Sequence, residues 1–375
     1  MAAPFAAAPA APAVPERATL LETLRIFALH LLCFVLPLAT LAFLGTAPHP
    51  WFLSLPWLGA VVASVLADNW SRSERRQPAA RLEAWPFDAV LLVLVAIQLL
   101  NVGLMVRMVA AHGFWRIDTL TAFFMVGINS GYSGIVVAHE LVHRKSKAFQ
   151  LLGRVLLCTV MYEHFYTEHV RGHHARVGTP EDPATARFGE SFHAFYRRTV
   201  PAQFRSAWRL ETRRLGDEEM RWLDPRLLRS RVLHGLLAEW SVAFAILAAA
   251  GPGAFALYLG QALVAIRLLE AVNYFEHWGL VRRGRKPAPV DSWDTDSWFT
   301  LYTLVGLSRH ADHHAFATRP FQQLRYWQES PKLPTGYFGM VDMVLFRNRK
   351  CRELMTAELQ RRRLGPFADA PRETA

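Results

Sequence analysis

Six long apolar stretches constrain the fold of this chain more than any other feature of its sequence. A helix needs roughly 20 apolar residues to cross a hydrocarbon core of about 30 Å. Stretches near this length cover residues 26–46, 51–68, 87–111, 118–138, 232–250 and 253–275, of which the second is short for a full crossing. Because backbone hydrogen bonds must be satisfied internally in lipid, apolar runs of this length predict helices. We therefore expect an all-α fold, a bundle of six transmembrane helices.

Arginine and lysine are distributed unevenly among the segments between these stretches. They concentrate in residues 69–86, in residues 139–231 and after residue 281, whereas the connections 46–50 and 251–252 contain none. Basic loops favour the cytoplasmic side of a membrane, so the alternation predicts that both termini lie in the cytoplasm. It also accounts for much of the formal net charge of +11 without a nucleic-acid partner.

The two ends of the chain differ in composition from the region between them. The first residues are rich in Ala and Pro and lack the basic-then-apolar order of a secretory signal. We expect flexible tails at residues 1–20 and 356–375 and a single membrane domain at residues 21–355. The three cysteines form no CxxC pair, which argues against an iron–sulfur centre within the chain.

Polar side chains interrupt the third and fourth apolar stretches. Gln98 lies in the third, and Asn129 and Ser133 lie in the fourth. Polar groups at membrane depth usually face the interior of a helix bundle. They either form hydrogen bonds between helices or line a cavity among them. Asn129 and Ser133 are our candidates for a cavity lining.

Nine of the 15 histidines fall in four short clusters. The clusters are HELVH (139–143), EHVRGHH (168–174), NYFEHWG (273–279) and LSRHADHHAF (307–316). Each cluster either directly follows an apolar stretch or lies in a basic segment, so the loop charges place all four on the cytoplasmic side. The clustered histidines are His139, His143, His169, His173, His174, His277, His310, His313 and His314. This distribution predicts a histidine-rich cytoplasmic cap on the helix bundle.

Nine imidazoles exceed the six ligands of an octahedral metal ion, so the clusters imply two metal ions. Imidazole is a good ligand for Fe, Cu, Zn and Ni. The three histidines of the last cluster could converge if that segment is helical, since His310 and His314 then lie one turn apart. Neighbouring charged groups would orient imidazole N–H groups, and the carboxylates among them could instead be ligands. These candidates are Glu140, Glu168, Glu276, Asp182, Asp312 and Arg309.

The motifs resemble those of the integral-membrane alkane 1-monooxygenases, which belong to the membrane fatty-acid desaturase and hydroxylase superfamily. The resemblance extends from about residue 20 to about residue 350 and is carried by HELVHRKS, EHVRGHHARVGTPEDPATAR, NYFEHWGL and LSRHADHHAFATRPFQQLR. The TPEDPA and RPFQQLR segments distinguish this branch from the acyl-CoA desaturases. Gly178, Trp278, Ser308 and Ala311 depart from residues that are common in the family, and none of them replaces a clustered histidine.

The resemblance implies two non-haem Fe ions held by the nine histidines. It implies that the protein uses O2 to hydroxylate the terminal carbon of an alkane. It also implies that electrons come from rubredoxin, which an NAD(P)H-dependent rubredoxin reductase would reduce. Basic stretches such as RNRKCR (347–352) would suit the docking of an acidic carrier, or would attract lipid headgroups. The family implies a multi-pass protein of the bacterial inner membrane. Within it, Trp57 is our candidate for limiting the accepted alkane length, and the alternative is an aromatic anchor at the membrane interface.

Other functions fit parts of this pattern. A lipid desaturase, or a hydroxylase of alkyl side chains on aromatics such as xylene, would share the histidine clusters, although TPEDPA favours hydroxylation. A zinc protease would use HELVH as its HExxH motif, but it leaves the other clusters without a purpose. A metal transporter would place its ligands near the bilayer midplane rather than at one end of the bundle.

Overall fold

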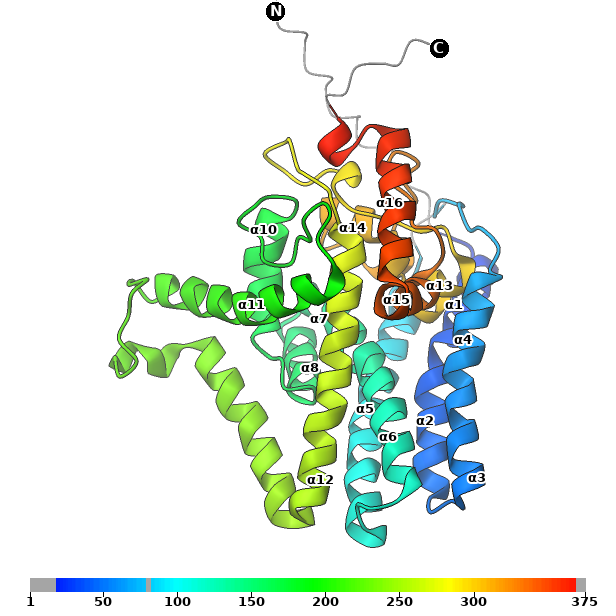
Figure 1. Cartoon of the computed structure of the whole chain (residues 1–375), viewed down its shortest axis with the longest axis vertical. Coiled ribbons are helices and arrows are strands. Elements are labelled where there is room, and N and C mark those ends of the chain that lie inside the picture. The colour runs from blue at the N-terminus through cyan, green and yellow to red at the C-terminus, as the bar shows by residue number, and fades with distance from the viewer. Residues whose placement is uncertain (1–17, 79–81, 369–375) are drawn as a thin grey trace, which may run out of the picture.

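The computed structural model of this protein describes residues 18–78 and 82–368 (Figure 1). Within these ranges the regular structure is helical, and β-type pairing is limited to the isolated bridges Ser73–Ser297 and Asp294–Lys332. The expected all-α class is therefore confirmed. Helices long and apolar enough to cross a membrane cover Leu20–Thr46, Trp51–Asn69, Trp85–His112, Ile117–Val142 and Arg231–His277.

Three of these five long helices are built from shorter pieces. The first contains α1 (Leu20–His30), the 3₁₀ turn η1 (Leu31–Phe34) and α2 (Val35–Thr46). The second contains α3 (Trp51–Ser54), η2 (Leu55–Leu58) and α4 (Gly59–Asn69). The third is the continuous α5 (Trp85–His112). The fourth contains α6 (Ile117–Asn129), the π-helix η3 (Ser130–Val136) and α7 (Val137–Val142).

The fifth helix, α12 (Arg231–His277), consists of two arms that meet in a V at the lower end of the bundle (Figure 1). Gly251 has φ 82° and ψ 178°, outside the helical region, and Pro252 follows it. Glycine adopts a positive φ without the steric cost of a Cβ, and proline has no N–H to continue the hydrogen-bond ladder. The break falls where the GPG sequence separates the two expected apolar stretches. The second arm then climbs through the bundle and ends at His277.

Shorter helices gather around the other end of the bundle (Figure 1). They include α8 (Lys147–Cys158), α9 (Phe165–Thr167), the π-helix η4 (Glu168–His173), α10 (His174–Arg176) and α11 (Phe192–Arg214). After α12 come α13 (Trp298–Thr303), η7 (Leu307–Arg309), α14 (His310–Ala315), η8 (Phe321–Gln323), α15 (Tyr337–Phe346) and α16 (Asn348–Arg362). These elements form a cap at the end where the second arm of α12 terminates.

The ends of the chain differ from the expected tails where the structure describes them. α16 continues to Arg362 and buries Leu359, so the last ordered helix passes the expected boundary at residue 356. The short turn η9 (Gly365–Phe367) follows it. The N-terminal helix begins at Leu20 with Thr19 as its N-cap. Residues 1–17 and 369–375 of the expected tails lie outside the described residues.

Close helix packing explains the small and polar residues of the fourth stretch. A Cβ added at Gly127 would lie 2.6 Å from Cβ of Val264, so α6 approaches α12 closely only because residue 127 is glycine. The Asn129 amide donates to Gln98 Oε1 at 2.9 Å, and Ser133 Oγ donates to Asn129 Oδ1 at 3.2 Å. These polar groups therefore join α5 to the α6–η3 helix.

Candidate metal centre

Five elements bring the nine clustered histidines to the capped end of the bundle. His139 lies in α7 and His143 ends it, while His277 is the last residue of α12. η4 and α10 carry His169, His173 and His174, and α14 carries His310, His313 and His314. Seven of the nine are buried, and His143 and His174 are half-buried. The topology thus assembles residues up to 175 positions apart, from His139 to His314, at one place.

The histidines form two groups whose ring nitrogens lie within 4.8 Å of one another in each group. The five-histidine group contains His139, His143, His169, His174 and His313. The four-histidine group contains His173, His277, His310 and His314. All nine predicted residues fall in these groups, and the other six histidines of the chain lie outside both.

The groups do not follow the sequence clusters. His173 and His174 belong to different groups, and so do His313 and His314. Successive helical residues point about 100° apart, so each pair can serve two neighbouring sites. The three histidines of LSRHADHHAF therefore divide between the two groups rather than meeting in one. His310 and His314 converge one turn apart, whereas His313 joins the five-histidine group.

Two π-helical segments set the direction of these side chains. η3 directly precedes the helix that carries His139, and η4 contains both His169 and His173. A π-helix widens the turn by one residue and often occurs at functional sites. Neither segment is predictable from the sequence, because side-chain periodicity does not report a single added residue in a turn.

The ring nitrogens have the arrangement that shared metal ligands require. Nε2 of His174 lies 3.1 Å from Nε2 of His169 and 3.2 Å from Nε2 of His313, and Nε2 of His310 lies 3.2 Å from Nε2 of His277. Metal–imidazole bonds of about 2.1 Å separate neighbouring ligand atoms by about 3 Å. The observed separations match this spacing.

Four further ring nitrogens are also available as metal ligands. Nε2 of His139, His143, His173 and His314 is buried and has no hydrogen-bond partner within the described chain. Buried polar atoms are nearly always satisfied, so this concentration is unusual for a packed protein interior. A donor set made only of imidazoles fits iron as well as other first-row transition metals. The residues present therefore fit two metal ions.

Burial keeps these imidazoles in the form that binds metal. It lowers the pKa of His169, His310 and His313 well below 6.5, and the neighbouring imidazoles lower the pKa values further. A charged imidazolium is disfavoured in a site that excludes water. The neutral form has a free ring nitrogen for a metal ion at neutral pH.

Two predicted carboxylates contact imidazoles of the four-histidine group. Asp182 Oδ2 lies 2.9 Å from Nδ1 of His173 and also accepts a hydrogen bond from the Thr185 hydroxyl at 2.6 Å. Glu276 Oε1 lies 3.3 Å from Nδ1 of His310 and accepts a hydrogen bond from the Tyr337 hydroxyl at 2.7 Å. The Asp182 hydrogen bond can hold the His173 ring in one orientation and leave its other nitrogen for a metal, whereas Nδ1 of His310 lies near Glu276 without a hydrogen bond.

The other four predicted partners of imidazole bond to different groups. Arg144 donates to Glu140 at 2.8 Å, and Arg176 donates to Glu168 at 2.8 Å. Asp312 accepts from the Arg319 guanidinium and from the Trp327 indole. Arg309 donates to the backbone oxygens of Leu324 and Arg76. These four residues therefore stabilise the cap. Adjacency to a histidine in sequence does not ensure contact with its ring.

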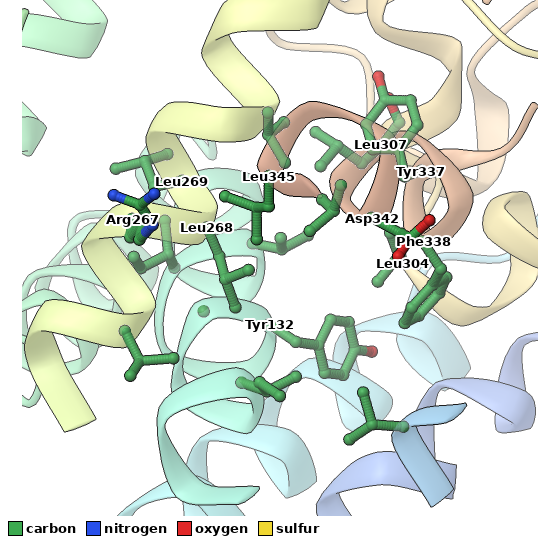
Figure 2. Close-up of a pocket in the computed structure, with 18 of the residues that line it drawn as sticks. Tyr132, Arg267, Leu268, Leu269, Leu304, Leu307, Tyr337, Phe338, Asp342 and Leu345 are labelled. Atoms are coloured by element: carbon green, nitrogen blue, oxygen red, sulfur yellow. The ribbon is translucent and has the colours of Figure 1, made fainter. Parts of the chain in front are cut away.

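An apolar cavity of about 800 Å³ reaches both histidine groups (Figure 2). Its walls come from α4, α6–η3, the second arm of α12 and α15, and it touches His139 and His169 of one group and His310 of the other. Figure 2 shows Tyr132, Leu268, Leu304, Phe338 and Leu345 around it. Leucine, valine and phenylalanine dominate the lining. A long apolar molecule would fit this cavity with one end beside the imidazoles.

The predicted channel residues lie outside this lining. Trp57 packs against the rings of Phe43 and His49, each with a centroid separation of 6.1 Å, and its neighbour Leu58 lines the cavity instead. Asn129 donates to Gln98, and Ser133 donates to Asn129. The lining residues Ile128, Gly131, Tyr132 and Ile135 share the helix face that leads to His139, so helical spacing counted back from that histidine would have found them.

Comparison with known proteins agrees with this architecture. Residues 117–342 match the family model described as fatty acid desaturase, which shows that the chain belongs to this family of histidine-rich proteins. Within it, the chain belongs with the alkane 1-monooxygenases. It is 35% identical to alkane 1-monooxygenase 2 of Pseudomonas aeruginosa over 80% of this chain and 82% of the relative.

Two further relatives define how far this similarity extends. Alkane 1-monooxygenase 1 of Pseudomonas aeruginosa is 43% identical, but the alignment covers only 59% of this chain and 58% of that relative. The xylene/toluene monooxygenase hydroxylase component of Pseudomonas putida is 23% identical over 55% of each chain. The chain is therefore more similar to these alkane 1-monooxygenases than to the xylene enzyme.

Proposed function

We propose that this protein hydroxylates the terminal carbon of alkanes with O2, at a centre of two non-haem Fe ions held by the nine histidines. The observation that carries the proposal is the junction between the apolar cavity and both histidine groups. An alkane in the cavity would contact mainly hydrocarbon walls and would point one terminus at the centre. The similarity to alkane 1-monooxygenases over most of the chain supports the same conclusion.

Iron, when bound, would supply the O2 chemistry that acid–base side chains cannot perform on an alkane C–H bond. In the balanced reaction, alkane, O2, two electrons and two protons yield one 1-alkanol and one water. The chain itself would orient the substrate and exclude water through the cavity walls. Asp182 would hold the ring of His173 through a hydrogen bond, and Glu276, fixed by Tyr337, would place a carboxylate beside the ring of His310.

We propose six membrane crossings, counting the two arms of α12 separately. The break at Gly251 supports this count, because each arm is an apolar helix of membrane-spanning length. The basic segments lie at the capped end, which supports a cytoplasmic cap and cytoplasmic termini. A bacterial inner membrane is the location that this orientation and the relatives favour.

Electrons would come from rubredoxin, reduced by an NAD(P)H-dependent rubredoxin reductase. The three cysteines of the chain, Cys33, Cys158 and Cys351, are free and lie on different elements, so they do not form a cluster site of their own. We propose that the two electrons of each turnover enter from another protein.

Product analysis tests the proposal directly. The full-length protein in lipid nanodiscs, with rubredoxin, its reductase and NADH, should convert a series of alkanes to 1-alkanols and should contain about two irons per chain. An alkene product would indicate a desaturase, and a benzylic alcohol formed only from xylene would indicate the aromatic side-chain hydroxylase. Zinc as the sole bound metal in fully active protein would contradict the iron centre.

A further inference from the structure

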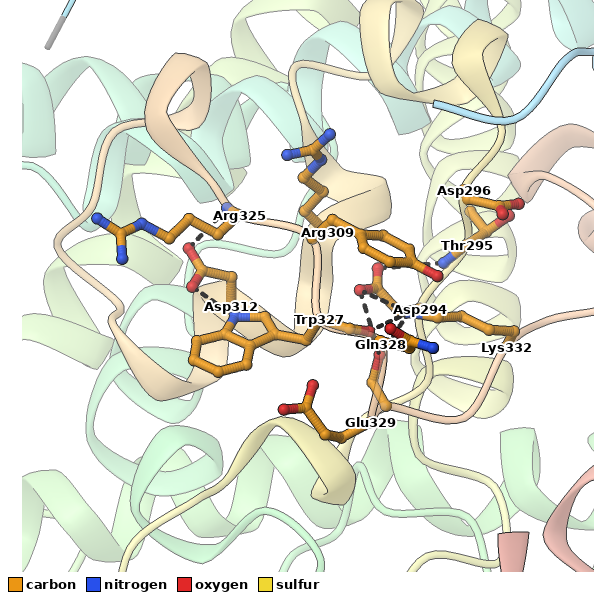
Figure 3. Close-up of polar contacts among 12 residues, drawn as sticks. Asp294, Thr295, Asp296, Arg309, Asp312, Arg325, Trp327, Gln328, Glu329 and Lys332 are labelled. Carbon is orange, nitrogen blue, oxygen red and sulfur yellow. Dashed lines mark hydrogen bonds and ion pairs between the residues drawn. The ribbon is translucent and has the colours of Figure 1, made fainter. Parts of the chain in front are cut away.

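A broad polar cleft opens beside residues 325–332 at the capped end (Figure 3). Its volume is about 990 Å³, and it shares no lining residue with the apolar cavity. Two carboxylates line it, Asp296 and Glu329. Its five cationic side chains are Arg75, Arg325, Lys332, Arg361 and Arg362.

The cleft presents its positive charge outward. Glu358, which pairs with Arg361 at 2.7 Å, has a side chain only 14% exposed, whereas the Arg361 side chain is 65% exposed. Asp294, 3.5 Å from the Lys332 ammonium, is fully buried. Asp296, which pairs with Arg75, and Glu329 line the cleft, but Glu358 and Asp294 lie beneath their cations, so a partner approaching the cleft meets five cationic side chains against two carboxylates. Such a surface attracts an acidic protein and increases its association rate.

Trp327 connects this cleft with the candidate metal centre (Figure 3). The indole lines the cleft, and its Nε1–H donates to Asp312 Oδ1 at 2.8 Å. Asp312 is buried and is followed in the chain by His313, a member of the five-histidine group. One hydrogen bond, the Asp312 side chain, one peptide unit and Cβ of His313 therefore connect the indole to an imidazole of the centre. Electron tunnelling depends steeply on distance, so such a short bonded route is favourable.

We propose that this cleft docks an acidic one-electron carrier protein, and that Trp327 with Asp312 forms the contact through which its electrons reach His313. The inference rests on the proposed function, since O2-dependent hydroxylation consumes two electrons that a carrier would deliver. Two reduced carriers would dock in turn and deliver one electron each. With two protons, these electrons balance the release of the second oxygen atom as water.

A second basic face of the cap is the competing dock. It is a depression of about 470 Å³ that contains Arg349, Arg352 and Glu353, within the RNRKCR region or next to it. Trp278 lines it and follows His277 in the chain. Its Nε1–H donates to the backbone oxygen of Glu190, whereas that of Trp327 donates to Asp312 beside His313. The larger excess of cations favours the cleft beside residues 325–332.

Charge reversal on each face tests which of the two surfaces binds the carrier. Full-length protein in nanodiscs, with and without Arg325→Glu/Arg361→Glu, is titrated by calorimetry with a rubredoxin of net negative charge at low salt. We expect Kd to rise by at least about tenfold in this variant, and the difference to shrink as salt screens the charges. The matched control Arg349→Glu/Arg352→Glu should change Kd by less than about twofold. The opposite pattern, or equal Kd values in all three proteins, would overturn the docking assignment.

Substitution of Trp327 tests the electron route. Trp327→Phe and Trp327→Leu should lower the hydroxylation rate at saturating carrier by about tenfold, and by clearly more than they lower the dithionite-driven rate. Asp312 keeps its bonds to Arg319 and to the Arg325 backbone, so the centre should retain its iron. An unchanged carrier-driven rate in Trp327→Leu would exclude this route. If the parent protein hydroxylates no alkane with either reductant, the proposed function fails, and the Kd comparison still decides whether the cleft is a dock.

Discussion

His173 and His174 are adjacent in the chain, yet their imidazoles belong to different histidine groups. His173 joins His277, His310 and His314, and His174 joins the five-histidine group. η4 therefore ends with a histidine of one group, and α10 begins with a histidine of the other. This relationship makes the contribution of each histidine to each metal separable by experiment.

Paired substitutions should distinguish the two groups. His173→Ala/His277→Ala, within one group, should leave about one iron per chain, whereas His173→Ala/His174→Ala, across the groups, should leave close to none. Iron is measured by mass spectrometry on protein purified in detergent. The exposed His193 provides the control, since His193→Ala should keep the parent iron content. Equal iron loss in the two double variants would refute the division into groups.

Asp182 should be required for tight metal binding. Asp182→Asn removes the charge that holds Nδ1 of His173, and loss of such a partner typically weakens metal affinity about 10- to 100-fold. Competition with a chelator of known affinity measures the effect. Glu168→Gln is the matched comparison, because Glu168 binds Arg176 rather than an imidazole and should leave metal affinity nearly unchanged. A larger loss in Glu168→Gln would mean that the sequence-based assignment of Glu168 is the better one.

Substitutions in the cavity wall should change the accepted alkane length. Ile128 lines the cavity about three helical turns before His139, so Ile128→Trp should obstruct its far end and reduce activity on the longest accepted alkanes by at least about tenfold. Trp57→Ser should leave the product profile unchanged, because Trp57 packs against Phe43 outside the lining. Product ratios from a mixture of alkanes measure both variants. A longer accepted alkane in Trp57→Ser would restore the original expectation for that residue.

The contact between α6 and α12 should be intolerant of added volume. Gly127→Ala places a Cβ 2.6 Å from Cβ of Val264, and overpacking of this kind costs about 1–3 kcal/mol in the free energy of unfolding. The same change at Gly103 meets no atom within 4 Å and should be neutral or stabilising, since alanine favours the helix. Thermal unfolding in one detergent compares the two. Equal unfolding temperatures of the two variants would show that α6 and α12 accommodate the added Cβ without loss of stability.

Much of the fold followed from local patterns. The apolar runs identified the membrane-length helices, and GPG identified the break in α12, because proline and a positive φ are local properties of the chain. The clustered histidines also predicted a place where imidazoles gather and could hold metal. The tail boundary at residue 356 did not follow, because α16 is a polar helix stabilised by burial of Cys351, Met355 and Leu359 against the rest of the protein.

The sequence by itself determined which residue types are available for chemistry: nine imidazoles, no paired thiols, and apolar helices to surround them. Only the tertiary structure decided how they are shared. The division of His173 from His174, the choice of Asp182 over Glu168 as an imidazole partner, and the lining by Ile128 rather than Asn129 all depend on side-chain direction. That direction is set by π-helical turns and by packing against elements far away in the chain. Neither can be inferred from local composition or from the spacing of residues.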